Sequence, residues 1–295
     1  MSAVGARPAT PRAWERMSRS RRAKSRAFTL AMWCSGIVAL VPLLLISSYV
    51  IRRGIGALDV GFFTHTALPA QVPGGGMEQA IIGTGVIIAI ATAIAVPLGL
   101  LTGIYLSEYS TGRTGSVVRF VAEILLSTPS IVAGAFIWAL VVVALGHFSA
   151  LAAGLALTVL MWPIVGRTTE EVLRLIPQEL REGALALGVP RWKVVLKIVL
   201  PTAGAGIATA IMLGIARGLG ETAPVLLTAL GNDFVNTNIL KPTDSITLRV
   251  FNYAQTPYDS LKALAWGGAL ILLLGVLALS ITARILSVRQ QRKTR

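Results

Sequence analysis

The stretch A-G-A-G-I-A-T-A-I-M-L-G-I-A-R-G-L-G-E-T-A-P-V-L-L-T-A-L, residues 203–230, is an apolar run that indicates a helical membrane protein. It exceeds the roughly 20 apolar residues that a helix needs to cross a bilayer. It carries two charges, on Arg217 and Glu221. On a continuous helix this spacing places both groups on one face, about 6 Å apart along the axis. A charge in such a run is costly unless it meets a partner, water or a ligand, so we predict a functional site here.

The composition of the whole chain is that of a polytopic membrane protein. Of its 295 residues, 54% are hydrophobic and 14% charged, and the mean hydropathy is +0.72, outside the range of ordinary soluble domains. The net charge of +14 does not favour a nucleic-acid partner, because the basic residues lie at the termini and in loops. The single cysteine, Cys34, has no partner in the chain, so we expect neither a disulfide framework nor a metal site.

Six apolar runs of about membrane length are separated by polar connections. The expected spans are residues 28–51, 80–106, 120–145, 150–166, 203–230 and 263–286. We therefore expect an all-helical transmembrane domain over residues 28–287 with a long loop at 167–201. Residues 1–27 form a basic arm that cannot bury a core and is expected to be disordered. Residues 288–295 form a short basic tail.

Basic residues are distributed unevenly between the two sides of these spans. The arm, the connection 108–119, the loop 167–200 and the tail from residue 284 hold 21 of the 27 lysines and arginines. The opposite loops hold five, and Arg217 is the remaining one. Because basic loops stay on the cytoplasmic side, both termini and the loop 167–200 are expected in the cytoplasm.

Several of the expected spans contain glycines and prolines. The G-x-x-x-G pairs Gly99/Gly103 and Gly214/Gly218 favour close helix packing over contact with a substrate. Glu123, near the start of the third span, is expected at the membrane interface or as a helix cap. The prolines expected to kink or weaken their helices are Pro97, Pro129 and Pro224.

The loop between the fourth and fifth spans contains a short amphipathic helix, starting P-Q-E-L-R-E-G-A-L-A-L-G from Pro177. Pro177 suits the first helical position, and Gly188 suits the left-handed position after the last turn. A second helix can begin at Pro190. The residues expected to line one face of the first helix are Leu180, Ala184 and Leu187. This narrow face, among charges of both signs, favours docking in a protein groove over lying on the membrane surface.

The same loop resembles that of the permease subunits of binding-protein-dependent ABC importers. Glu182-Gly183-Ala184, Gly188 and Ile198-x-Leu200-Pro201 have the spacing of the family motif E-A-A-x3-G-x9-I-x-L-P, with glycine in place of the first alanine. The resemblance implies an all-α, type I (MetI-like) permease fold. It also implies that the short helix is a coupling helix, which docks in a cleft of a separate ATPase subunit. The implied coupling residues are Leu180, Glu182, Gly183, Ala184, Leu187 and Gly188.

Further stretches resemble the phosphate importers of this family, over roughly residues 73–287. They are Gly83-Thr84, Pro97-Leu98-Gly99, I-Y-L-S-E-Y at 104–109, P-S-I-V-A-G at 129–134 and, as the most specific, R-G-L-G-E-T-A-P at 217–224. The resemblance implies location in the bacterial cytoplasmic membrane with three kinds of partner. These are a homologous permease, an ATPase dimer that uses ATP and Mg, and an extracytoplasmic phosphate-binding protein. This chain itself is expected to bind no cofactor.

For a phosphate substrate, Arg217 is the expected ligand because its planar guanidinium gives bidentate hydrogen bonds to an oxyanion. Glu221 either holds Arg217 while the pore is empty or accepts a hydrogen bond from protonated phosphate. The alternative is a structural ion pair between helices. Thr222 is a candidate hydroxyl donor, unless it bonds back to its own helix.

Two other functions remain open at this point. The chain contains no G-x-x-x-x-G-K-[ST] phosphate loop, so we expect a transport subunit and not an enzyme that hydrolyses ATP. A permease for another oxyanion would look similar. An ion-coupled secondary transporter would also place an Arg and a Glu near the membrane midplane, but it has no need of a coupling helix.

Overall fold

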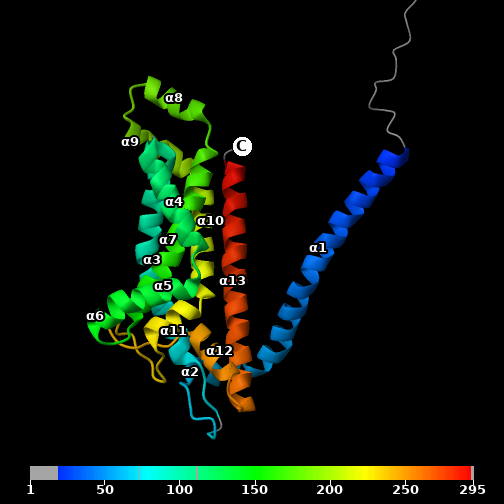
Figure 1. The fold of residues 1–295 in the computed structure, drawn as a ribbon, viewed down its shortest axis with the longest axis vertical. Coiled ribbons are helices and arrows are strands. Elements are labelled where there is room, and N and C mark those ends of the chain that lie inside the picture. Colours follow the sequence, from blue (N-terminus) through cyan, green and yellow to red (C-terminus); the bar gives the residue numbers. More distant parts are fainter. Residues whose placement is uncertain (1–18, 73, 111, 294–295) are drawn as a thin grey trace, which may run out of the picture. The chain divides into compact units, whose positions relative to one another are not determined.

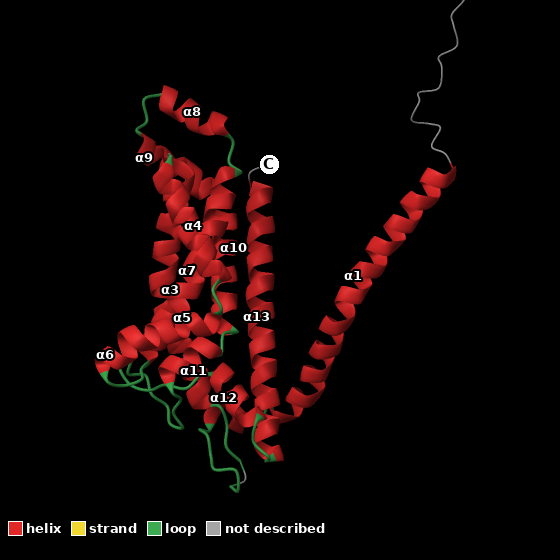
Figure 2. Ribbon diagram, in the orientation of Figure 1, coloured by secondary structure: helices red, strands yellow, loops and turns green. Residues whose placement is uncertain are grey.

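A computed structural model describes residues 19–72, 74–110 and 112–293 (Figure 1). Within these ranges the secondary structure is helical, with no strand (Figure 2). Contacts divide the chain into two units, residues 1–49 and 50–295. The two units are described separately.

Helix α1 (Arg19–Gly54) forms the described part of the first unit as far as Tyr49. Its candidate span, Ala23–Ala57, has no buried residue in its apolar window. A helix that is apolar all round requires lipid or another protein around it. Residues 1–18 of the expected arm lie outside the described residues, and residues 19–27 are the first turns of α1.

The second unit contains the other candidate spans. Four are continuous: Glu78–Tyr109, Ala150–Arg174, Arg191–Leu219 and Asp259–Ile285. The first consists of α3 (Glu78–Ile104) and the π-helical η3 (Tyr105–Tyr109), and the second is α7 (Ala150–Arg174). The third consists of α9 (Arg191–Val194), the π-helical η5 (Val195–Val199) and α10 (Leu200–Leu219). The fourth is most of α13 (Asp259–Lys293). Another is broken into α4 (Arg113–Ser127) and a second arm of α5 (Ser130–Ile137), π-helical η4 (Trp138–Val142) and α6 (Val143–Leu145). Counting the broken pair as one span gives six spans with α1.

The third span is not the continuous helix expected over residues 120–145. Its two arms meet at 103°, and Figure 1 shows α5 running across the direction of α7. Thr128 and Pro129 are extended, with ψ of 130° and 134°. A residue before proline disfavours the helical region, and the proline ring blocks the turn before it. Pro129 therefore ends α4 where we expected only a kink.

The fourth span does not end at residue 166, as expected, but continues as α7 to Arg174. The charges that suggested a loop are paired. Glu170 is fully buried and meets Arg119 of α4 at 2.7 Å, Arg167 at 3.1 Å and Arg174 at 2.7 Å. Because a buried carboxylate with several partners is satisfied, the helix extends past its apolar part.

Helix α7 lies at the centre of the second unit, where Leu157 and Met161 belong to its main apolar core. Glycines allow the neighbouring helices to approach it. A methyl group on Gly99 would lie 2.7 Å from Cβ of Val165, and one on Gly103 would lie 2.6 Å from Cβ of Thr169. Gly214 and Gly218 of α10 are equally close to Val165 and Met161 of α7, at 2.8 and 2.7 Å.

Short helices mark the two ends of this unit. Helix α8 (Gln178–Ala186) lies at one end, and α2 (Val60–Thr64) and α12 (Ile246–Ala254) lie at the other (Figure 1). We call these the α8 end and the α12 end. The remaining short elements are the 3-10 turn η2 (Ile55–Ala57) and α11 (Ala223–Ala229). The polar stretches 52–78 and 231–262 were expected to be loops without α2 and α12.

Candidate functional site

The helix that carries Arg217 ends at Leu219 instead of continuing to residue 230, and it begins at Arg191 instead of residue 203. The expected bounds of the fifth span were therefore wrong. The N–H of Gly220 bonds to the carbonyls of Arg217 and Gly218. Pro224 lies in the first turn of α11, where the missing N–H is harmless. Its ring would clash with the carbonyl of residue 220 in a continuing helix, which accounts for the break.

The Arg217–Glu221 ion pair lies at this break. Nε of Arg217 is 2.7 Å from Oε1 of Glu221, and the side chains are 59% and 11% exposed. Arg217 is in the last turn of α10, where a cation is favoured by the carbonyl end of the helix. The sequence suggested a guanidinium enclosed within an apolar run, but the structure does not enclose it. It projects from the end of the helix with most of its surface open.

The backbone of Glu221 is held by the α12 end. Thr247 donates its hydroxyl to the carbonyl of Glu221 at 3.1 Å, and the N–H of Ile246 donates to Oγ1 of Thr84 on α3 at 2.9 Å. Thr84, Glu221 and Thr247 border a cavity of about 10 Å³, which is room for one water molecule. Thr222 directly precedes α11 and makes no side-chain capping bond.

Two of the sequence stretches named above meet next to this break. A methyl group on Gly134, in P-S-I-V-A-G, would lie 2.6 Å from Cα of Pro224, in R-G-L-G-E-T-A-P. Thr228 donates to the carbonyl of Pro224 at 2.6 Å within α11. The second arm of the bent third span therefore packs directly against the segment that follows Glu221.

Sequence reasoning missed a buried charge cluster at the α12 end. Arg249 donates to Asp244 at 2.6 Å and to Asp233 at 2.8 Å, and Gln79 of α3 donates to Asp244 at 3.4 Å. Arg249 and Asp244 are 9% and 1% exposed, and the guanidinium lies 5.3 Å from the ring centre of Tyr253. Burial raises the pKa of the Asp244 carboxyl, although the charge of Arg249 lowers it. The five-residue spacing of Asp244 and Arg249 gave no recognisable signal in the sequence.

At the α8 end, the short helix runs over residues 178–186, with Pro177 just before it. Gly188 has a left-handed φ of +78°. Glu182 and Gly183 are exposed, and Leu180 and Leu187 are 46% and 85% exposed. Ala184 is 8% exposed and packs in a core cluster with residues of α7, α9, η5 and α10. Leu180, Ala184 and Leu187 therefore do not share one face, because Leu187 lies beyond the last helical residue.

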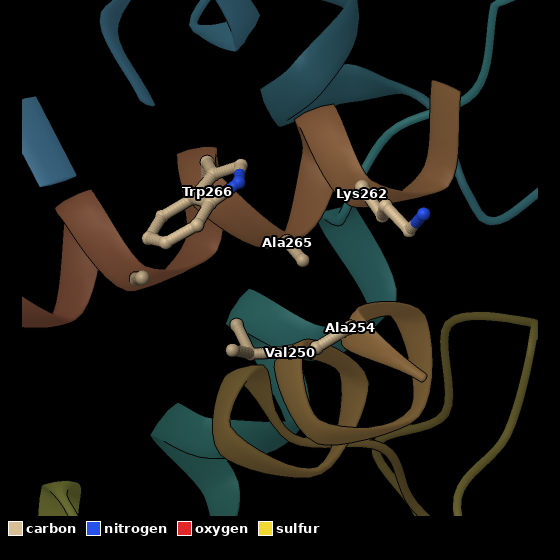
Figure 3. Close-up of a pocket in the computed structure, with 6 residues that line it drawn as sticks. Val250, Ala254, Lys262, Ala265 and Trp266 are labelled. Atoms are coloured by element: carbon tan, nitrogen blue, oxygen red, sulfur yellow. The ribbon is translucent and has the colours of Figure 1, made fainter. Parts of the chain in front are cut away.

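Other predicted positions lie away from these two regions. Pro97 lies inside α3, which continues through it. Glu123 is exposed in the middle of α4 and caps neither end. A hollow of about 210 Å³ between α12 and α13 is lined mainly by apolar side chains (Figure 3). In the described ranges, no cluster of His, Cys, Asp and Glu suits a metal ion.

Comparison with known proteins gives the family. Residues 95–292 match the binding-protein-dependent transport system inner membrane component family. The chain belongs to this family. As such it is a multi-pass membrane subunit of an ABC transporter. It is 41% identical to the phosphate transport system permease protein PstA of Yersinia pestis over 92% of both chains.

A second relative and two solved structures are also similar to this chain. The phosphate transport system permease protein PstA 1 of Mycobacterium tuberculosis is 39% identical over 98% of this chain and 95% of its own. The fold resembles the inward-facing MetNI methionine ABC transporter, with a TM-score of 0.59 at 20% identity, covering 72% of this chain and 96% of the other. A bacterial alginate ABC transporter gives 0.59 at 15% identity, covering 92% and 99%.

Proposed function

We propose that this chain is a permease subunit of an ATP-driven ABC importer that carries inorganic phosphate across the cytoplasmic membrane. Relatives named as phosphate transport permeases match it at about 40% identity over most of both chains. The structural observation that carries the proposal is the exposed guanidinium of Arg217, held by Glu221 at a break between two helices.

The chemistry of this pair suits an anion that must bind and then leave. A guanidinium stays charged at any cellular pH and offers paired N–H groups that match a tetrahedral oxyanion. Glu221 pairs with Nε of Arg217, and so would compete with an incoming anion for the guanidinium. This competition weakens net binding, which conduction requires. Thr222, the residue after Glu221, is a further candidate hydroxyl donor to the anion.

The site is incomplete in one chain. The cavity beside Glu221 has room for only about one water molecule, whereas Arg217 is 59% exposed. We place the phosphate path on the open side of Arg217, between this chain and a homologous, PstC-like permease. The exposed apolar side chains of α4 and α5 give such a partner surface to contact.

The energy would come from a pair of PstB-like ATPase subunits that use ATP and Mg, while this chain binds no cofactor. The exposed residues Leu180, Glu182 and Leu187 supply a docking surface at the α8 end, with Gly183, Ala184 and Gly188 shaping the helix. A PstS-like phosphate-binding protein would deliver substrate at the α12 end. The excess of basic residues near the α8 end supports placing that end and both termini in the cytoplasm.

The test is ATP-dependent phosphate uptake by the complete complex reconstituted in liposomes. Uptake that requires ATP, and that excess sulfate or molybdate leaves intact, is the expected result. Preferential uptake of another anion would instead support a permease for that oxyanion. Uptake that continues without any ATPase subunit would support an ion-coupled carrier.

A further inference from the structure

Arg181 is the one charged side chain of α8 that turns inward in the described structure. It is only 15% exposed, whereas Glu179 and Glu182 on the same helix are exposed. Its Nη2 donates to Oε1 of Glu108 at 2.8 Å and its Nε donates to Oε2 at 3.2 Å. Two parallel bonds of this kind fix orientation as well as distance. We call this contact the Arg181–Glu108 clamp.

The clamp also binds the end of α7. Arg181 donates to the carbonyls of Leu173 at 2.8 Å and Ile176 at 2.6 Å. The last carbonyls of a helix lack partners within the helix, and a cation there is favoured by the helix dipole. A single guanidinium therefore joins α8, the end of α7 and the end of the helix that carries Glu108.

Glu108 is buried in the π-helical segment η3, which continues α3. Its residue exposure is 5%. Ser107 donates to its carboxylate at 3.2 Å, and Arg191, at the start of α9, donates to its backbone carbonyl. A buried carboxylate with these partners is satisfied, whereas removal of Arg181 would leave it without its counter-charge. The pair is therefore a firm connection between α8 and α3.

The opposite part of α3 reaches the proposed phosphate site. Thr84 lies about 36 Å from Glu108 along the helix axis at 1.5 Å per residue. Oγ1 of Thr84 accepts a bond from Ile246, and Thr247, the next residue, donates to the carbonyl of Glu221. One continuous helical span, Glu78–Tyr109, thus joins the clamp to the segment that holds Glu221.

We propose that Arg181 and Glu108 are positioning residues that transmit the displacement of α8 to α3, and through Thr84 to the backbone of Glu221. This route acts beside the direct one through α9, η5 and α10, which begins next to α8 and ends at Arg217. The two sides of the Arg217–Glu221 pair are then moved by different helices. The proposal rests on the proposed function, because it assigns α8 to the ATPase contact.

The test compares Arg181→Gln, Glu108→Gln and the double variant in the reconstituted complex. We expect Arg181→Gln to be less stable than the double variant, because it leaves buried Glu108 without its counter-charge. In the complex that assembles, we expect retained basal ATP hydrolysis and about tenfold less phosphate carried per ATP, within the range for mutations along a coupling network. The double variant should be no worse than either single variant, because both remove the same link. The matched control is Arg174→Gln, which leaves buried Glu170 with Arg119 and Arg167 and should retain wild-type stoichiometry.

A second measurement keeps the test decisive if the variants do not assemble. In the wild-type complex, a non-hydrolysable ATP analogue should change amide exchange in residues 105–109 together with residues 178–186. A change at 178–186 alone would overturn the clamp as a transmission route. So would wild-type stoichiometry in both single variants, additive losses in the double variant, or an equal loss in Arg174→Gln. Failure of the wild-type complex to carry phosphate would instead reject the proposed function.

Discussion

Replacing Arg217 with Gln separates a substrate ligand from a structural ion pair. Although Glu221 is only 11% exposed, Arg217 is 59% exposed, so solvent screens the pair on the guanidinium side and we assign it the modest contribution of an exposed ion pair, about 0–1 kcal/mol. Arg217→Gln should therefore assemble normally. A hydrogen bond to a charged group contributes about 1.5–3 kcal/mol. If that bond is made to phosphate in the rate-limiting step, uptake should fall about 10- to 100-fold.

The assay is the initial rate of ATP-dependent phosphate uptake in liposomes that contain equal amounts of complex. Arg217→Lys is the matched control, since it keeps the charge but loses the planar pair of donors, and its rate should lie between wild type and Arg217→Gln. Normal uptake by Arg217→Gln would refute the assignment of Arg217 as a ligand. A loss of uptake that parallels lost assembly would show that the ion pair is structural.

Glycine positions give three further predictions. Gly188→Val should lower the stimulation of ATP hydrolysis by the loaded binding protein, because the φ of Gly188 is +78° and a β-branched residue there costs about 1–2 kcal/mol. Gly188→Asn should retain this stimulation, and equal stimulation in the two variants would contradict the prediction. Gly183→Ala should slow amide exchange in residues 178–186 about two- to fivefold, since nothing lies within 4 Å of the added methyl and alanine favours the helix by about 0.5–1 kcal/mol. Gly99→Ala should lower the melting temperature by overpacking, at about 1–3 kcal/mol, whereas Gly85→Ala, on the same helix with nothing within 4 Å, should not.

The number of spans followed from hydropathy, but their ends did not. Hydropathy averages over a window, whereas the end of α10 depends on the ring of one residue, Pro224. At α7, the charged residues led to a predicted helix that was too short. The sequence shows Arg167 and Glu170 as a polar loop, but it does not show that Glu170 is buried among three arginines.

The site was predictable where its residues are close in the sequence. The four-residue spacing of Arg217 and Glu221 predicted their ion pair, although they do not share a continuous helix. Contacts over long sequence separations were not predictable without coordinates. Arg181 meets Glu108 and Arg249 meets Asp244 because helices fold back on one another, and no local pattern distinguishes these charges from solvated ones.

The π-helical segments η3 and η5 have a further consequence for how helix faces are set. Each segment lies near the α8 end of a long helix, between the residues next to α8 and the rest of the span. Deleting one residue there would rotate everything beyond it by about 100° and shift it by about 1.5 Å. Glu108 and Thr84 would then no longer point to their present partners at the same time. Single-residue insertions and deletions in residues 105–109 and 195–199 can thus rotate the side chains at one end of a span while leaving those at the other end unchanged.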